Sequence, residues 1–191
     1  MPRARDENKI QQIHSAAMKL VVKTGFSSLK MADVAKEAGI ATGTLYIYYK
    51  SKEELINELF ILTKKEIADV MLSPDNQSPI LYESFRKMWM AYFLFCYRNP
   101  EKMLFVEQFL YSGLISEDNI KLSNNYFAPL DQFLELAKQQ SYIKNMDVEI
   151  LKASMQGALH EIIKVLMKNN LPIESFPLNS LFDLTWNGIR L

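Results

Sequence analysis

Few side chains in this sequence are arranged for covalent or metal chemistry. His160 and Glu161 begin like a zinc-protease helix, but Lys164 stands where that motif needs its second histidine. The single cysteine, Cys96, lies among aromatic residues with no histidine nearby in the sequence, and buried thiols are mostly inert. His14 is predicted on the surface of the first helix, solvated or close to a phosphate. Because phosphate-binding loops and Gly-rich dinucleotide motifs are also missing, we expect no catalytic residue, no metal site and no cofactor.

The stretch "ATGTLYIYYKSKEEL", residues 41–55, offers a different chemistry, the recognition of a polyanion. On a helix with about 100° per residue, Leu45 and Tyr49 share one face, which we predict to be inward. The remaining positions point outward or lie on the flanks. They are Gly43, Thr44 and Ile47 outward, with Tyr46 and Tyr48 on opposite flanks.

This distribution suits a helix that lies in the major groove of DNA. Small residues at its start allow close approach of the backbone, and Ile47 could meet a thymine methyl group. The hydroxyls of Tyr46 and Tyr48 can reach phosphates on either wall of the groove. Lys52, in the first turn of the next helix, can hold a phosphate together with free backbone amides. The alternative, that the tyrosines only fill a helical junction, is preferred for Tyr49 alone.

The elements that must position these residues are all predicted to be helices. Two short helices, about 31–38 and 42–49, are separated by "AGIA", which describes a helix-turn-helix at about residues 30–49. A helix with Ile10 and Ile13 on its apolar stripe precedes them and ends at Gly25. Ser51 and Glu54 form a capping box that opens the fourth helix. Longer helices are predicted at about 80–97, 100–112, 122–140, 147–169 and 178–189.

The polar segment "SPDNQSP", residues 73–79, is the best candidate for a domain boundary. We therefore predict an all-α protein of about nine helices. An N-terminal three-helix DNA-binding domain with its connecting helix occupies residues 6–66, and a larger helical bundle occupies residues 75–191.

The segment "DVAKEAGIATGTLYIYYKSKEEL", preceded by "AAMKLVVKTGFSSLKMA", resembles the N-terminal domain of TetR/AcrR-type transcriptional regulators. The resemblance covers roughly residues 8–60 without a gap. By this resemblance the residues that lie at the DNA would be Thr42, Gly43, Thr44, Tyr46, Ile47, Tyr48 and Lys52.

Three positions depart from the pattern of that family. Lys30 replaces a Ser or Thr that caps the second helix and touches a phosphate, and a lysine can do only the second of these well. Ala32 replaces a frequent Arg, and Tyr48 replaces a frequent His. We keep Lys30 among the DNA-binding candidates and expect no contact from Ala32.

Aromatic residues are dense in the bundle between residues 85 and 133, and at helical spacing such a set is more often core than ligand site. The family resemblance nevertheless implies a small-molecule pocket between the helices, here for a largely apolar ligand that is aromatic or lipid-like. The candidate ligand-binding residues are Trp89, Phe93, Phe105, Gln108, Phe109, Tyr111, Tyr126, Gln156 and His160.

The last two helices carry apolar stripes, and the resemblance implies that such a pair forms a four-helix dimer interface. Two recognition helices must also reach successive major grooves, which favours a twofold-symmetric dimer. The alternative is that these stripes face only their own domain. The candidate interface residues are Met155, Leu159, Ile162, Leu166, Leu181 and Leu184.

The net charge is zero, but residues 1–52 contain nine Lys and Arg against four Asp and Glu, as expected of a face that binds a polyanion. No apolar run resembles a signal peptide or a membrane span, so we expect a cytoplasmic protein. We interpret the chain as a homodimeric, sequence-specific DNA-binding repressor, released from a near-palindromic operator by a small apolar effector. Two alternatives stay open: a DNA-bound scaffold for a protein partner, and, less favoured, a helical enzyme.

Overall fold

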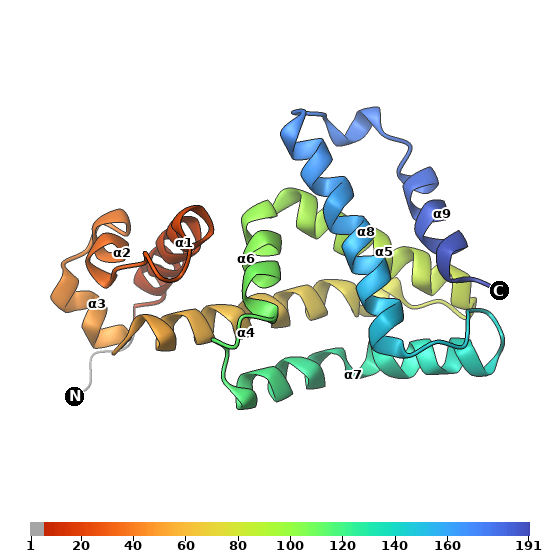
Figure 1. Ribbon diagram of the computed structural model, residues 1–191, viewed down its shortest axis with the longest axis horizontal. Coiled ribbons are helices and arrows are strands. Elements are labelled where there is room, and N and C mark those ends of the chain that lie inside the picture. The colour runs from red at the N-terminus through yellow and green to blue at the C-terminus, as the bar shows by residue number, and fades with distance from the viewer. Residues whose placement is uncertain (1–5) are drawn as a thin grey trace. The chain divides into compact units, whose positions relative to one another are not determined.

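The computed structural model describes residues 6–191, and every regular element in that range is a helix (Figure 1). The predicted all-α fold class, with about nine helices, is confirmed. In chain order the α-helices of the described range are α1 (Glu7–Thr24), α2 (Met31–Glu37), α3 (Thr42–Tyr48), α4 (Lys52–Met71), α5 (Leu81–Arg98), α6 (Pro100–Leu110), α7 (Glu117–Gln139), α8 (Val148–Lys168) and α9 (Leu178–Ile189). Two short 3₁₀ turns, η1 (Pro74–Asn76) and η2 (Ile173–Ser175), lie in connections.

The contacts divide the chain into two compact units that do not follow chain order. The first unit contains the chain up to Lys65 together with Glu101–Ser123, and the second contains Glu66–Pro100 with Asn124–Leu191. Helices α4 and α7 therefore each contribute to both units. The predicted functional domains, 6–66 and 75–191, stay a prediction, but α6 and the start of α7 pack with the N-terminal helices.

In the first unit, helix α1 has a local signal at each end. Asp6 caps its N-terminus by accepting hydrogen bonds from the amides of Asn8 and Lys9, at 3.1 and 3.4 Å. Gly25 follows its last turn with φ 79°, a conformation that favours glycine. Between these ends Ile13 and Val21 are fully buried, so the apolar stripe predicted from the sequence faces the core.

The predicted capping box before α4 is present, with one difference. The Ser51 hydroxyl accepts from the Glu54 amide at 3.1 Å. Glu54 reaches back to the amide of Lys50, at 2.7 Å, one residue earlier than the motif prescribes. Both bonds lie at the turn that connects α3 to α4.

The second unit is built around aromatic rings from α5 and α9. These two helices contact each other, and both contact α8 (Figure 1). Phe85 of α5 lies 5.2 Å from Trp186 and 6.0 Å from Phe182 of α9, measured between ring centroids. Trp89 stacks on Phe93 at 5.2 Å. All five side chains are at least nine-tenths buried, so Phe85, Trp89 and Phe93 of the predicted aromatic set belong to the core.

Helix α7 begins at Glu117, five residues before the predicted start. The signal is local, because the Ser116 hydroxyl accepts from the Asn119 amide and Glu117 and Asp118 occupy the first turn. Pro129 lies inside the helix. Among the described residues, none of the helices is long and apolar enough to cross a membrane.

Candidate DNA-binding interface

Helices α2 and α3 pack against each other and are joined by a turn that depends on one glycine. Gly39 has φ 69°, and the amide of Ile40 donates to the carbonyl of Ala35 at 2.9 Å, which closes α2. A Cβ at Gly39 would meet no atom within 4 Å, so the glycine is needed for its conformation and not for space. The predicted helix-turn-helix is present.

Helix α3 buries one face and exposes the other. Leu45 and Tyr49 are 0% and 1% exposed, as predicted, and Tyr49 ends the helix with an extended backbone. Ile47 is 79% exposed and Tyr46 is 50% exposed, so the outer face of α3 presents two large side chains to solvent. Thr42 and Gly43 are also exposed, while Thr44 and Tyr48 are half-buried.

Gly43 is exceptional because the described chain gives no reason for a glycine there. It lies inside α3, where glycine costs about 1 kcal/mol relative to alanine. Its φ is not in the left-handed region, and an added Cβ would meet no atom within 4 Å. Neither the backbone nor the packing of the chain therefore requires it.

The two predicted lysines differ in their surroundings. Lys30 is exposed at the N-cap of α2 and makes no side-chain capping bond, in agreement with the expected loss of the cap. The Lys52 ammonium donates to the carbonyl of Phe26 at 3.0 Å and lies 4.4 Å from the centroid of its ring. The Phe26 ring in turn packs edge-on against Phe109 of α6, at 6.0 Å.

The prediction that His14 is solvated or near a phosphate is wrong. Its ring, on α1, is largely buried, and its Nε2 lies 2.6 Å from the Tyr49 hydroxyl. The same hydroxyl donates to Glu58 Oε1 of α4 at 2.7 Å. Burial lowers the pKa of His14, and the charge of Glu58 and its hydrogen bond act in the opposite direction. The partners come from positions 35 and 44 residues further along the chain, so no local pattern around His14 could have found them.

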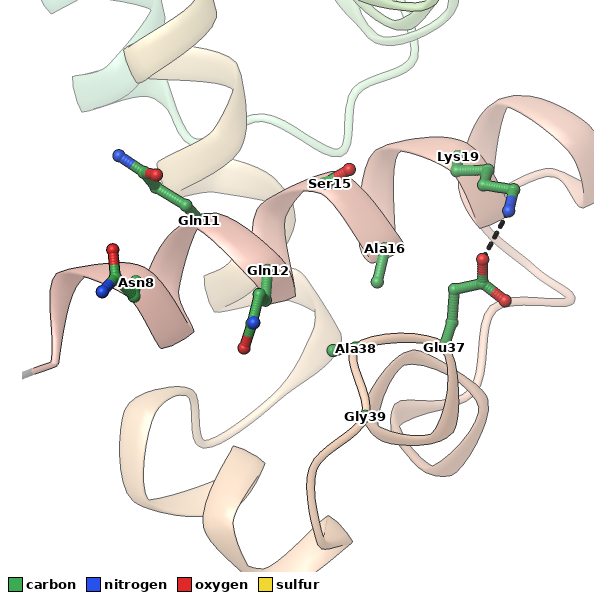
Figure 2. Close-up of a pocket in the computed structure, with 9 residues that line it drawn as sticks. All are labelled: Asn8, Gln11, Gln12, Ser15, Ala16, Lys19, Glu37, Ala38 and Gly39. Atoms are coloured by element: carbon green, nitrogen blue, oxygen red, sulfur yellow. Dashed lines mark hydrogen bonds and ion pairs between the residues drawn. The ribbon is translucent and has the colours of Figure 1, made fainter.

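A polar groove of about 710 Å³ lies between α1 and the end of α2 (Figure 2). At one end Lys19 donates to Glu37, and this hydrogen bond lowers the pKa of the Glu37 carboxyl. The groove is open and lined mostly by amide, hydroxyl and charged side chains, as Figure 2 shows. Its lining residues are Asn8, Gln11, Gln12, Ser15, Ala16, Lys19, Glu37, Ala38 and Gly39.

The predicted ligand-binding residues fall in both units. Phe105, Gln108, Phe109 and Tyr111 belong to the first unit, and the other five belong to the second. Phe105 and Phe109 are buried with their ring centroids 4.9 Å apart, whereas Tyr111 is 87% exposed. Among these nine residues, ring contacts join Phe105 with Phe109 and Trp89 with Phe93, so the predicted set is divided between the two units.

In the second unit, polar groups interrupt the aromatic core. The Tyr92 hydroxyl of α5 lies 2.7 Å from Nε2 of the buried His160 of α8. The indole N–H of Trp89 and the hydroxyl of Thr185 are buried and have no hydrogen-bond partner. Burial raises the pKa of the Cys96 thiol to about 12, so this cysteine is unreactive. Tyr126 and Gln156 are half-buried.

The candidate dimer residues also separate by exposure. Leu184 of α9 is 70% exposed, and Met155, Ile162 and Leu181 are half-buried. Leu159 and Leu166 of α8 are 1% exposed and already belong to the core of their own chain. Within residues 6–191, no group of three His, Cys, Asp or Glu side chains is placed to hold a metal ion.

Comparisons with known proteins match both parts of the chain. Residues 13–59 match the family described as bacterial regulatory proteins, tetR family, and residues 80–190 match the tetracyclin repressor-like C-terminal domain. An uncharacterised HTH-type transcriptional regulator of Haemophilus influenzae is 29% identical over 99 residues, which cover 52% of this chain and 53% of that protein. The fatty acid metabolism regulator protein of Bacillus subtilis is 24% identical over 95% of this chain and 96% of its own. A crystal structure of a TetR family transcription regulator from Marinobacter aquaeolei has a TM-score of 0.87, with 24% identity and 97% of each chain covered.

Proposed function

Because the chain belongs to the TetR family of bacterial regulators, a class of DNA-binding proteins and not of enzymes, we propose that it regulates transcription by binding a specific DNA sequence through α3. The observation that carries this proposal is the exposed face of α3. It displays Ile47 at 79% exposure beside a glycine that its own chain does not need.

A partner that approaches the backbone closely accounts for both features. With Gly43 in the middle of the contact, α3 comes nearer to the floor of a major groove than a helix with a side chain there. Ile47, one turn further along, then meets the methyl group of a thymine. Contact with the groove would remove the apolar surface of Ile47 from water, which favours binding.

Phosphate contacts fix the register of this helix. Lys30, Tyr46 and Tyr48 lie on or beside the exposed surface of the helix-turn-helix and can reach the two strands. Lys52 must exchange its bond to the Phe26 carbonyl for a phosphate, or keep this bond and leave the phosphate to the α4 amides. The operator is a near-palindrome bound by a homodimer, since twofold symmetry brings two such helices to successive grooves.

We propose further that the protein is a cytoplasmic repressor released by a small apolar effector held in the second unit. Trp89 and Thr185 support this, because each has a buried polar atom without a hydrogen-bond partner, and a site for an apolar ligand needs a few such polar points. An acyl-chain effector is supported by the name of the Bacillus subtilis relative, a fatty acid metabolism regulator. A thermal-shift screen in which only polar anions raise the melting temperature would contradict this assignment.

The route to the DNA is supported by contacts inside the first unit. The Asn57 side chain of α4 donates to the carbonyl of Leu114 at 3.1 Å and accepts from the amide of Ser116 at 2.8 Å, so it holds the connection between α6 and α7. The ring of Phe109 on α6 packs against the ring of Phe26, and the Lys52 ammonium donates to the carbonyl of Phe26. A ligand that prefers one position of α6 and α7 thereby shifts the population of DNA-competent molecules, with a typical coupling of about 1–3 kcal/mol.

The test of DNA recognition starts from a duplex that the protein itself selects out of a randomised library. We expect a selected near-palindrome and about tenfold weaker binding by Ile47→Ala, because one apolar base contact is lost. Fluorescence anisotropy across a salt series measures the affinity, and the salt slope stays unchanged because phosphate contacts remain.

Leu62→Ala is the matched control, because it truncates another exposed apolar side chain of the first unit, on α4. It should leave the affinity unchanged. Enrichment of no sequence, or an equal affinity of Ile47→Ala and wild type, would contradict DNA reading by α3.

A further inference from the structure

Helix α3 is too short to fix its own orientation. It has seven residues, its N-cap Ala41 provides no side-chain bond, and only Leu45 is buried along it. A helix of two turns is unstable by itself and takes its direction from tertiary anchors. Besides Leu45, the anchor is Tyr49, the C-cap residue that directly follows the helix.

Tyr49 joins three helices through one hydroxyl group. The hydroxyl lies 2.6 Å from His14 Nε2 on α1 and donates to Glu58 Oε1 on α4 at 2.7 Å. The direct distance between His14 Nε2 and Glu58 Oε1 is 3.5 Å, so the phenol oxygen bridges the pair. The Tyr49 ring is 1% exposed and lies 5.8 Å from the imidazole, measured between centroids.

The protons in this chain of bonds are fixed by the donors available. A phenol has one proton, and that proton goes to Glu58. His14 must therefore carry a proton on Nε2 and donate it to the phenol oxygen. The hydrogen bonds from His14 to Tyr49 and from Tyr49 to Glu58 thus run in one direction.

We propose that His14, Tyr49 and Glu58 are positioning residues for DNA recognition, and that their hydrogen-bond chain sets the angle of α3 against α1 and α4. The inference rests on the proposed function, since it concerns the accuracy with which α3 presents Gly43 and Ile47 to base edges. Rotation of α3 about Leu45 would keep its phosphate contacts within reach of long side chains but displace Ile47 from a base. A hydroxyl at Tyr49 that resists this rotation therefore contributes to specificity more than to affinity for DNA in general.

The decisive variant is Tyr49→Phe, which keeps the buried ring and removes the bridging oxygen. We expect its affinity for the selected duplex to fall about tenfold, the weight of one base contact, while its affinity for a scrambled duplex stays within about twofold. The salt slope should not change, because the number of neutralised phosphates is the same. Both affinities are measured by anisotropy on the full-length protein.

A conservative pair of variants at Glu58 tests the same bond from its other side. Glu58→Gln retains an acceptor oxygen for the phenol and should keep the specificity ratio, whereas Glu58→Leu should lower it as Tyr49→Phe does. Combining Tyr49→Phe with Glu58→Leu should add nothing, because both remove one interaction.

The matched control is Tyr97→Phe in the second unit. Its hydroxyl also makes two hydrogen bonds, to the carbonyl of Leu171 and from the amide of Ile173, at 3.3 and 3.1 Å. Loss of these bonds should lower the melting temperature and leave the specificity ratio intact. If Tyr49→Phe behaves like Tyr97→Phe, with lower stability and an unchanged ratio, the positioning role is overturned. If the wild type selects no duplex, the proposed function fails first, and the two failures are thus distinguished.

Discussion

Protonation of His14 opposes folding, since its burial outweighs the attraction of Glu58. The pKa of His14 is lowered from its ordinary value of 6.5 in the folded protein. Below that value the unfolded chain binds more protons than the folded chain, so stability is present above pH 6.5 and declines as the pH falls towards the folded pKa. The His14 ring faces the Glu58 carboxylate of α4 and the Tyr49 hydroxyl, which follows α3. The carboxylate of Glu37 on α2 is paired with Lys19.

This sign gives a prediction for His14→Gln, which keeps an N–H donor for Tyr49 but cannot titrate. Between pH about 7.5 and about 5.5, the free energy of unfolding of the wild type should fall more steeply than that of the variant. Urea unfolding at several pH values measures both free energies. In the difference between the two curves, the pH dependence contributed by the shared carboxylates cancels. Parallel curves would show that His14 has the same proton affinity in the folded and unfolded chains.

At the scale of elements, sequence patterns predicted helices where the signals are local. Gly25 and the Ser51 capping box mark the end of α1 and the start of α4 within a few residues. Ser116 and the acidic turn after it are an equally local signal for the start of α7, and the predicted start at about residue 122 did not use it. The roles of His14 and Asn57 could not be predicted, because their partners lie between 35 and 62 residues away in the chain. Such pairings depend on how the helices pack and not on spacing.

The connection between α6 and α7 should carry the response to an effector, and Asn57→Ala tests this. Under the proposed function, saturated fatty acids of increasing chain length should weaken binding of the wild type to its selected duplex, and the duplex should weaken fatty acid binding by the same factor. In Asn57→Ala, the fatty acid should change DNA affinity less, and DNA should change fatty acid affinity less, because the bonds to Leu114 and Ser116 are lost. Anisotropy and tryptophan fluorescence report the two affinities.

Asn99→Ala is the control for that experiment. It removes an asparagine that bonds to the carbonyl of Phe95 at the end of α5, in the second unit, and should leave the coupling unchanged. Unequal factors for ligand and DNA in the wild type would contradict two-state coupling, and an unchanged coupling in Asn57→Ala would show that another contact carries it.

At the scale of the whole molecule, one exposed apolar residue of α9 supports the proposed dimer. Leu184 is 70% exposed, a state that association with a second copy would relieve. Leu184→Glu places a charge at this position and should convert the dimer to a monomer, with loss of cooperative binding to both half-sites. Light scattering coupled to gel filtration measures the mass. Ile80→Glu alters another exposed apolar residue, 62% exposed before α5, and should stay dimeric. A Leu184→Glu protein that also stays dimeric would place the interface elsewhere.

The position of Cys96 makes this chain its own reporter of transient opening. It is the only cysteine among 191 residues, its side chain is inaccessible, and its pKa of about 12 leaves almost no thiolate in the native state. Alkylation must therefore wait for the second unit to open, and under excess reagent its rate counts those openings. An effector that binds in the aromatic core should slow the alkylation of Cys96, whatever its effect on DNA binding. The measurement needs no label and no substitution.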